Sequence, residues 1–104
     1  MHFLAALANA PAHEPTHLNA RNNLGLALLS QGRTEEGIAQ LEEVLRLDPT
    51  FVSAHSNLGA ALSLMGRHVG AMEHLKAAAN LDPDNEVLRS NLELAIQRAR
   101  SSNR

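Results

Sequence analysis

The chain has 104 residues, of which 44% are apolar but only 2% aromatic, and nine basic and eleven acidic residues leave a net charge of −2. This length fits one domain. The shortage of aromatic residues disfavours a β-sheet, whereas Ala and Leu propagate helix well, so the predicted class is all-α. The charges form no basic stripe for nucleic acid, and the lack of cysteine excludes disulfides and cysteine nucleophiles.

The chain begins with a short apolar segment. Residues 2–10 include Phe3, Leu4 and Leu7 and predict a helix that Pro11 ends. No Lys or Arg precedes the segment, as a signal peptide would require, and no apolar run approaches the ~18 residues of a membrane span. We therefore expect a cytoplasmic protein without a membrane span. Eight of the nine basic residues are Arg, which is consistent with a GC-rich bacterial genome.

The next part of the chain repeats with a period that indicates a helical solenoid. Residues 18–51 and 52–85 are identical at twelve of 34 positions without a gap. The first helix of each unit is expected to end at Gly32 or Gly66, because glycine readily takes the left-handed conformation that terminates a helix. Its start is predicted from the residues that follow the repeat-phase prolines and that commonly cap helices, namely Thr16, Thr50 and Asp84.

The second helix of each unit is predicted near 34–47 and 68–81, before an Asp-Pro pair. Residues 86–100 predict a closing helix with apolar and polar sides, as the end of a solenoid requires. Its expected inward residues are Val87, Leu88, Leu92, Ala95, Ile96 and Ala99. Its expected solvent-facing residues are Arg89, Glu93, Gln97, Arg98 and Arg100.

The order Asn-Leu-Gly, Gly-Arg, Leu and Leu-Asp-Pro at this period resembles the tetratricopeptide repeat. The resemblance implies a right-handed solenoid of antiparallel helix pairs with about six helices. Its parts are a half-repeat helix at 2–10, repeats at 18–51 and 52–85, a capping helix at 86–100 and a tail at 101–104. The site where the family usually has Trp holds Arg21, His55 and Arg89. Gly37 replaces a usual Ala and should cost its helix about 1 kcal/mol.

In this family the first helices of successive repeats line a concave groove that holds a partner protein. The resemblance implies that a peptide would contact Asn19, Asn22, Asn23, Leu26, Ser53, Ser56, Asn57, Ala60, Ser90, Asn91 and Leu94. Further residues expected to face the groove are Leu29, Ser30, Ser63, Leu64 and Arg98. The surface so defined is polar and nearly uncharged.

Asn23, Asn57 and Asn91 recur once in each first helix. An amide side chain can donate to a carbonyl and accept from an N–H together, so a row of amides can pair with a peptide backbone. The row is similar to the asparagine ladder of O-linked N-acetylglucosamine transferases. The alternative is that each Asn bonds to the neighbouring helix.

The sequence predicts no catalytic site, metal site or cofactor, and therefore no enzyme. His13, Glu14 and His17 are interrupted by Pro15, so they do not form a helical metal-binding pair. The leading hypothesis is a scaffold or adaptor that binds a segment of another protein, as a monomer. Two alternatives stay open. One is self-assembly, for example a homodimer formed through the N-terminal helix, and the other is a targeting arm of a larger enzyme such as a glycosyltransferase.

Overall fold

The computed structural model describes residues 15–102, and these form five helices in succession. The helices are α2 Pro15–Ser30, α3 Thr34–Leu47, α4 Val52–Leu64, α5 His68–Leu81 and α6 Glu86–Ser102. The described part contains no strand, which confirms the all-α prediction. The helix expected at 2–10 lies outside the described residues, and the closing helix continues two residues beyond the predicted end at 100.

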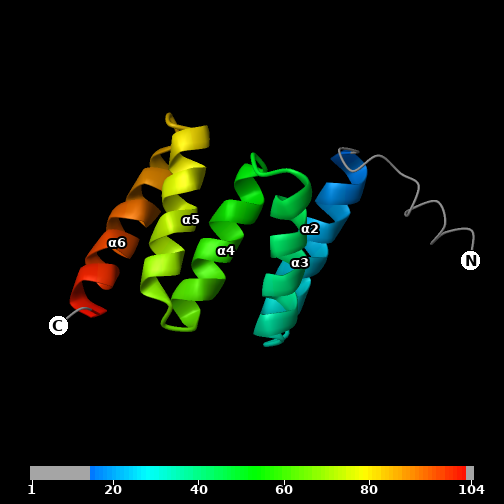
Figure 1. Ribbon diagram of the computed structural model, residues 1–104, viewed down its shortest axis with the longest axis horizontal. Coiled ribbons are helices and arrows are strands. Elements are labelled where there is room, and N and C mark those ends of the chain that lie inside the picture. The colour runs from blue at the N-terminus through cyan, green and yellow to red at the C-terminus, as the bar shows by residue number, and fades with distance from the viewer. Residues whose placement is uncertain (1–14, 103–104) are drawn as a thin grey trace, which may run out of the picture.

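The helices stack in a row, with α2 near one end and α6 at the other (Figure 1). The chain reverses between α2 and α3 and again between α4 and α5, and each of these pairs packs together as a hairpin. α3 also contacts α4, and α5 contacts α6. The arrangement is a solenoid in which each helix pair packs on the next.

Both predicted glycine turns are present. Gly32 and Gly66 have φ of 80° and 78°, in the left-handed region. The backbone N–H of Arg33 donates to the Leu28 carbonyl at 2.9 Å, while that of Gly32 donates to the Leu29 carbonyl at 3.1 Å. These bonds satisfy the last carbonyl groups of α2 in a Schellman motif. The same motif ends α4.

The predicted cap of α4 was wrong. Thr50 lies two residues before the helix, and the N-cap position is held by Phe51. The reason is a turn, because the Phe51 N–H donates to the Asp48 carbonyl at 3.1 Å. The Asp48 carboxylate accepts hydrogen bonds from the Thr50 N–H at 3.0 Å and from its hydroxyl at 2.7 Å. Thr16 likewise lies within α2 and not before it.

The predicted cap of α6 was wrong by one residue. Asn85, and not Asp84, precedes the helix. The Asn85 side-chain oxygen accepts a hydrogen bond from the Leu88 N–H at 3.2 Å, which satisfies one of the free N–H groups of the first turn. The Asn85 N–H closes a turn on the Asp82 carbonyl at 3.2 Å. The turn that follows Asp82-Pro83 is therefore one residue longer than the sequence suggested.

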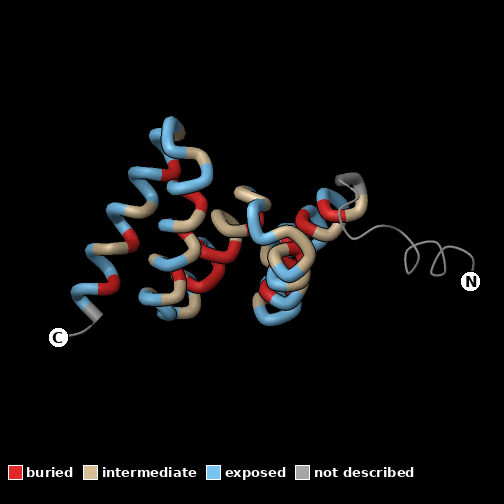
Figure 2. The backbone as a smooth tube through the Cα atoms, turned by 45° about the horizontal axis from the view of Figure 1, so that its top comes forward, coloured by how far each residue is buried: buried red, intermediate tan, exposed pale blue. Residues whose placement is uncertain are grey.

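The core lies between the helices, while their outer sides are exposed (Figure 2). Its largest fully buried side chains are Leu18, Leu41, Val44 and Leu58. Burying one Leu or Val side chain stabilises the fold by roughly 1.5–3 kcal/mol.

Gly37 has a packing role that helix propensity does not reveal. A Cβ added at Gly37 would lie 2.8 Å from the Gly25 carbonyl oxygen and 2.9 Å from the Leu29 side chain. A Cβ at Gly25 would in turn lie 2.9 Å from the Leu41 side chain. The absence of both side chains lets α2 and α3 approach closely, so the expected cost of Gly37 to its helix is offset by contact between helices.

α6 presents its predicted polar side to solvent, and Leu88, Ala95 and Ala99 are buried as expected. Val87 was assigned to the wrong side, because it is 67% exposed. The buried residues follow at spacings of seven and four along the helix and form one stripe. Val87, one residue before Leu88, lies beside that stripe.

Candidate peptide-binding groove

A groove of about 210 Å³ lies between the first helices α4 and α6. α4 lines it with Ser56, Asn57, Gly59, Ala60 and Ser63. α6 lines it with Asn91, Leu94, Ala95 and Arg98, and Leu75 of α5 completes it. Of the residues predicted to contact a peptide, this lining contains Ser56, Asn57, Ala60, Asn91 and Leu94, but not Ser53 or Ser90.

Two rows of equivalent residues run across the first helices. One row is the amide set Asn23, Asn57 and Asn91, and Asn23 and Asn91 are exposed. The second row lies three residues further along each helix and consists of Leu26, Ala60 and Leu94. Residues three apart lie on the same side of a helix, so an amide and an apolar group are neighbours on each first helix. Asn23 and Leu26, on α2, lie outside the lining of the α4–α6 groove. Leu26 is 39% exposed and Leu94 is 45% exposed.

Asn22 holds the first two repeats together on this side. It is 5% exposed, and its amide donates to the Ser53 hydroxyl at 3.2 Å. Asn57 donates to the Asn22 side-chain oxygen and to the Ser53 hydroxyl, each at 3.3 Å. This burial differs from the exposed position expected for Asn22. It places Asn22 behind the groove surface, where it orients Asn57.

Arg98 brings the only charge to the groove lining. Its guanidinium donates to the Ser63 hydroxyl at 3.1 Å, which connects α6 to α4 at the far end of the groove. Arg98 also lines a neighbouring depression with His68, Gln97 and Ser101. Neither lining contains a carboxylate.

Some expected groove residues lie elsewhere. Leu29 is half-buried and packs on the core, because the missing side chain of Gly37 makes room for it. The Ser30 hydroxyl donates back to the Leu26 carbonyl at 3.1 Å. Ser90 lines a separate depression together with Glu86, Arg89 and Glu93. Asn19 is exposed on α2, outside the α4–α6 groove.

The ion pairs of the described residues lie away from the groove. Arg33 contacts Glu36 at 2.7 Å, and Arg46 contacts Glu43 at 2.6 Å. The hydrogen bonds from the two arginines lower the pKa of both carboxyl groups. Exposed pairs of this kind contribute little to stability.

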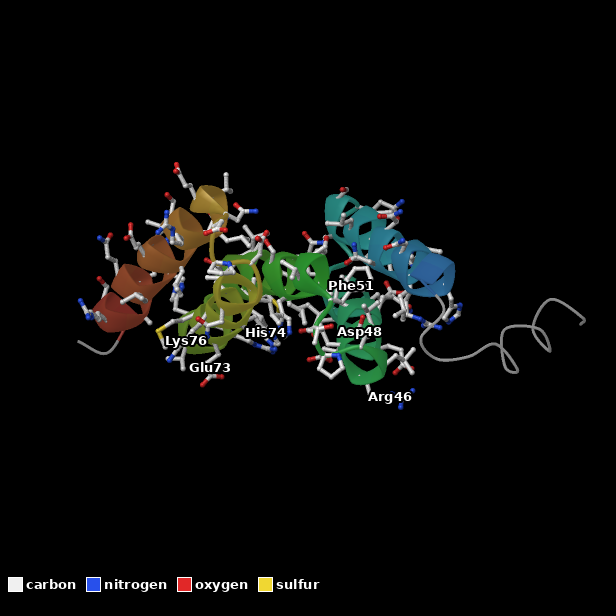
Figure 3. The ribbon with its side chains drawn as sticks, turned by 90° about the horizontal axis from the view of Figure 1, so that it is seen from above. Arg46, Asp48, Phe51, Glu73, His74 and Lys76 are labelled. Atoms are coloured by element: carbon white, nitrogen blue, oxygen red, sulfur yellow. The ribbon has the colours of Figure 1, made fainter. Side chains whose placement is uncertain are left out.

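A histidine pair that sequence reasoning missed joins α4 to α5. The His55 and His74 Nδ1 atoms are 3.1 Å apart, and His55 Nε2 lies 2.8 Å from the Pro49 carbonyl. A carbonyl can only accept, so His55 Nε2 carries a proton and neutral His55 accepts at Nδ1. His74 Nδ1–H is then the donor. Figure 3 labels His74 on α5, the second helix of this hairpin.

Between residues 15 and 102, no three His, Cys, Asp or Glu side chains are grouped so that they could hold a metal ion. Within the same residues, no helix has the length and apolar character needed to cross a membrane.

Comparison with known families identifies the repeat. A family model described as TPR repeat matches residues 25–66, and a second described as tetratricopeptide repeat matches residues 52–85. None of the curated proteins compared with the chain matches it. The two matches together span residues 25–85, which the structure shows as stacked helix pairs with glycine turns. The chain therefore belongs to the tetratricopeptide-repeat family.

Proposed function

We propose that the chain is a scaffold or adaptor that binds an extended or helical segment of a partner protein in the groove between α4 and α6. Tetratricopeptide repeats generally mediate protein–protein interactions. The observation that carries the proposal is the chemistry of the lining, where Asn57 and Asn91 lie beside Ala60 and Leu94. Amides can pair with a peptide backbone, and the apolar row can accept an apolar side chain.

The asparagine row is the finer part of this proposal. The Asn57 amide nitrogen is already used by Asn22 and Ser53. Among the described residues, no hydrogen bond reaches the Asn57 side-chain oxygen, so this oxygen is available to a peptide N–H. Each such bond adds a net ~0.5–1.5 kcal/mol. Three such bonds alone would bind a peptide weakly, and contacts of the peptide with the apolar row would increase the affinity.

A binding role is supported over a catalytic one by what lines the groove. The lining contains no His, Asp, Glu or Lys side chain, the groups that most often act as a general base. Ser56 and Ser63 therefore lack, within this lining, the adjacent base that activates a serine nucleophile. Arg98 is suited to hydrogen bonding and not to proton transfer, because a guanidinium stays charged.

The test begins with a peptide selected from a random phage-displayed library on the full chain. Its affinity is then measured by calorimetry for the wild type and for the Asn23→Ala/Asn57→Ala/Asn91→Ala variant. We expect at least tenfold weaker binding with unchanged helical circular dichroism. Asn80→Ala is the matched control, since Asn80 is exposed on α5 and absent from the groove lining. Equal affinity of the triple variant and the wild type would show that the asparagine row does not contact the peptide.

A further inference from the structure

One side of α2 carries three apolar residues that no described helix covers. Ala20, Leu24 and Ala27 are all exposed, and Leu24 is 48% exposed. One repeat later the chain has the same three residue types, and each is 0% exposed: Ala54, Leu58 and Ala61. The same apolar side is therefore fully buried in α4 and open in α2.

In α4, this apolar side is covered by α3, the second helix of the preceding repeat. α3 packs against α4, and Ile38, Leu41 and Val44 belong to the same buried cluster as Leu58. These three residues are 5%, 0% and 0% exposed. Their spacing of three places them on one side of α3. A cover for α2 would need the same arrangement of apolar side chains.

The sequence supplies that arrangement one period earlier. Leu4, Leu7 and Ala10 stand 34 residues before Ile38, Leu41 and Val44. We propose that residues 2–10 cover the Ala20, Leu24 and Ala27 side of α2 as a helix, with Leu7 against Leu24, as α3 covers α4. These residues lie outside the described part of the chain.

The connection favours a segment of the same chain over a second copy. Four residues, 11–14, separate the segment from α2, and four residues, 48–51, separate α3 from α4. A tether this short gives the segment an effective concentration in the millimolar range. A second copy at micromolar concentration would compete poorly for the same small surface.

Hydrogen exchange tests the inference on the full chain. In the wild type, amides of residues 6–10, which have a carbonyl partner four residues earlier in the proposed helix, should exchange at least tenfold more slowly than in the Leu24→Asp variant, because a carboxylate on α2 would expel the segment. Leu64→Asp is the matched control: Leu64 is 83% exposed on α4, and this variant should keep the wild-type protection. Unprotected amides in the wild type, or equal protection in both variants, would overturn the inference.

A disulfide distinguishes cover of α2 by residues 2–10 of the same chain from cover by a second copy. The chain has no cysteine, so Leu7→Cys/Leu24→Cys under mild oxidation reports one contact. We expect a disulfide within one chain, and none in Leu7→Cys/Glu93→Cys, whose second site lies on α6. Disulfide-linked dimers, or protection of residues 6–10 that rises with protein concentration, would show that a second copy covers α2 and would refute the assignment.

Discussion

Arg21 and His55 occupy equivalent sites 34 residues apart, and each makes a polar contact with the second helix of its own hairpin. The Arg21 guanidinium donates to the Gln40 side-chain oxygen at 2.9 Å. His55 Nδ1 lies 3.1 Å from His74 Nδ1. Both contacts span 19 residues. A hydrogen bond between helices thus replaces the aromatic residue that is usual at this site.

The histidine pair makes stability dependent on pH. Burial lowers the pKa of His74 below its ordinary value of 6.5, and the electrostatic effect of neighbouring His55 lowers it further, while Glu42 on α3 and Glu73 on α5 oppose the shift. The unfolded chain therefore binds more protons than the folded chain below about pH 6.5. We expect the free energy of unfolding to fall as the pH drops from 6.5 toward the lower pKa of folded His74, as measured by urea denaturation.

His74→Gln tests the origin of that dependence. Gln is the residue at the equivalent site of the first repeat, Gln40, and it does not titrate. The variant should show a smaller loss of stability between about pH 7.5 and 5. Asn80→Gln, at an exposed site on α5, changes no titratable group and should keep the wild-type dependence. If His74→Gln keeps it as well, the histidine pair is not its source.

Gly37→Ala should destabilise the protein although Ala favours helix by about 1 kcal/mol. The new Cβ would lie 2.8 Å from the Gly25 carbonyl oxygen, and backbone cannot yield as a side chain can. Overpacking of this kind typically costs ~1–3 kcal/mol. Gly70→Ala is the control, because its Cβ would meet only the Leu62 side chain at an ordinary 3.4 Å. Urea denaturation should show a loss for the first variant and a gain or no change for the second.

The repeat period made the helices predictable. The second helices were expected near 34–47 and 68–81, and α3 and α5 have these bounds. Gly32 and Gly66 were identified correctly because a left-handed residue after a helix strongly favours glycine. Starts were less predictable. Any Ser, Thr, Asp or Asn near the start can cap, and a turn of unknown length decides which residue does.

Contacts between helices could not be predicted from the period alone. Asn22 and Asn23 are adjacent amides, yet the first is 5% exposed and the second is exposed. A rotation of α2 by one residue would bring Asn23 to the buried site of Asn22. The histidine pair was missed for the same reason, since His55 and His74 are 19 residues apart and meet only through the hairpin.

Asn85→Ala should weaken the start of α6. The Asn85 side-chain oxygen accepts the Leu88 N–H at 3.2 Å, and loss of a cap costs about 1 kcal/mol. Asp84→Ala, at the exposed neighbouring residue, should cost less, since Asp84 is not the N-cap residue. Thermal denaturation followed by circular dichroism compares the two. A larger loss of stability for Asp84→Ala would show that Asp84, as the sequence first suggested, is the N-cap residue.

Asn22→Ala and Asn23→Ala separate positioning from contact in the groove. Asn22→Ala removes the hydrogen bonds to Ser53 and from Asn57, and we expect a loss of about 1 kcal/mol or more in the free energy of unfolding. Asn23 is exposed, so Asn23→Ala should leave stability within about 0.5 kcal/mol. Both variants should bind a selected peptide more weakly, the first because Asn57 loses its orientation and the second because one amide of the row is gone. Urea denaturation measures the stability of each variant, and calorimetry on the same samples measures its affinity for the peptide. An unchanged stability for Asn22→Ala would mean that the buried amide network does not hold α2 and α4 together.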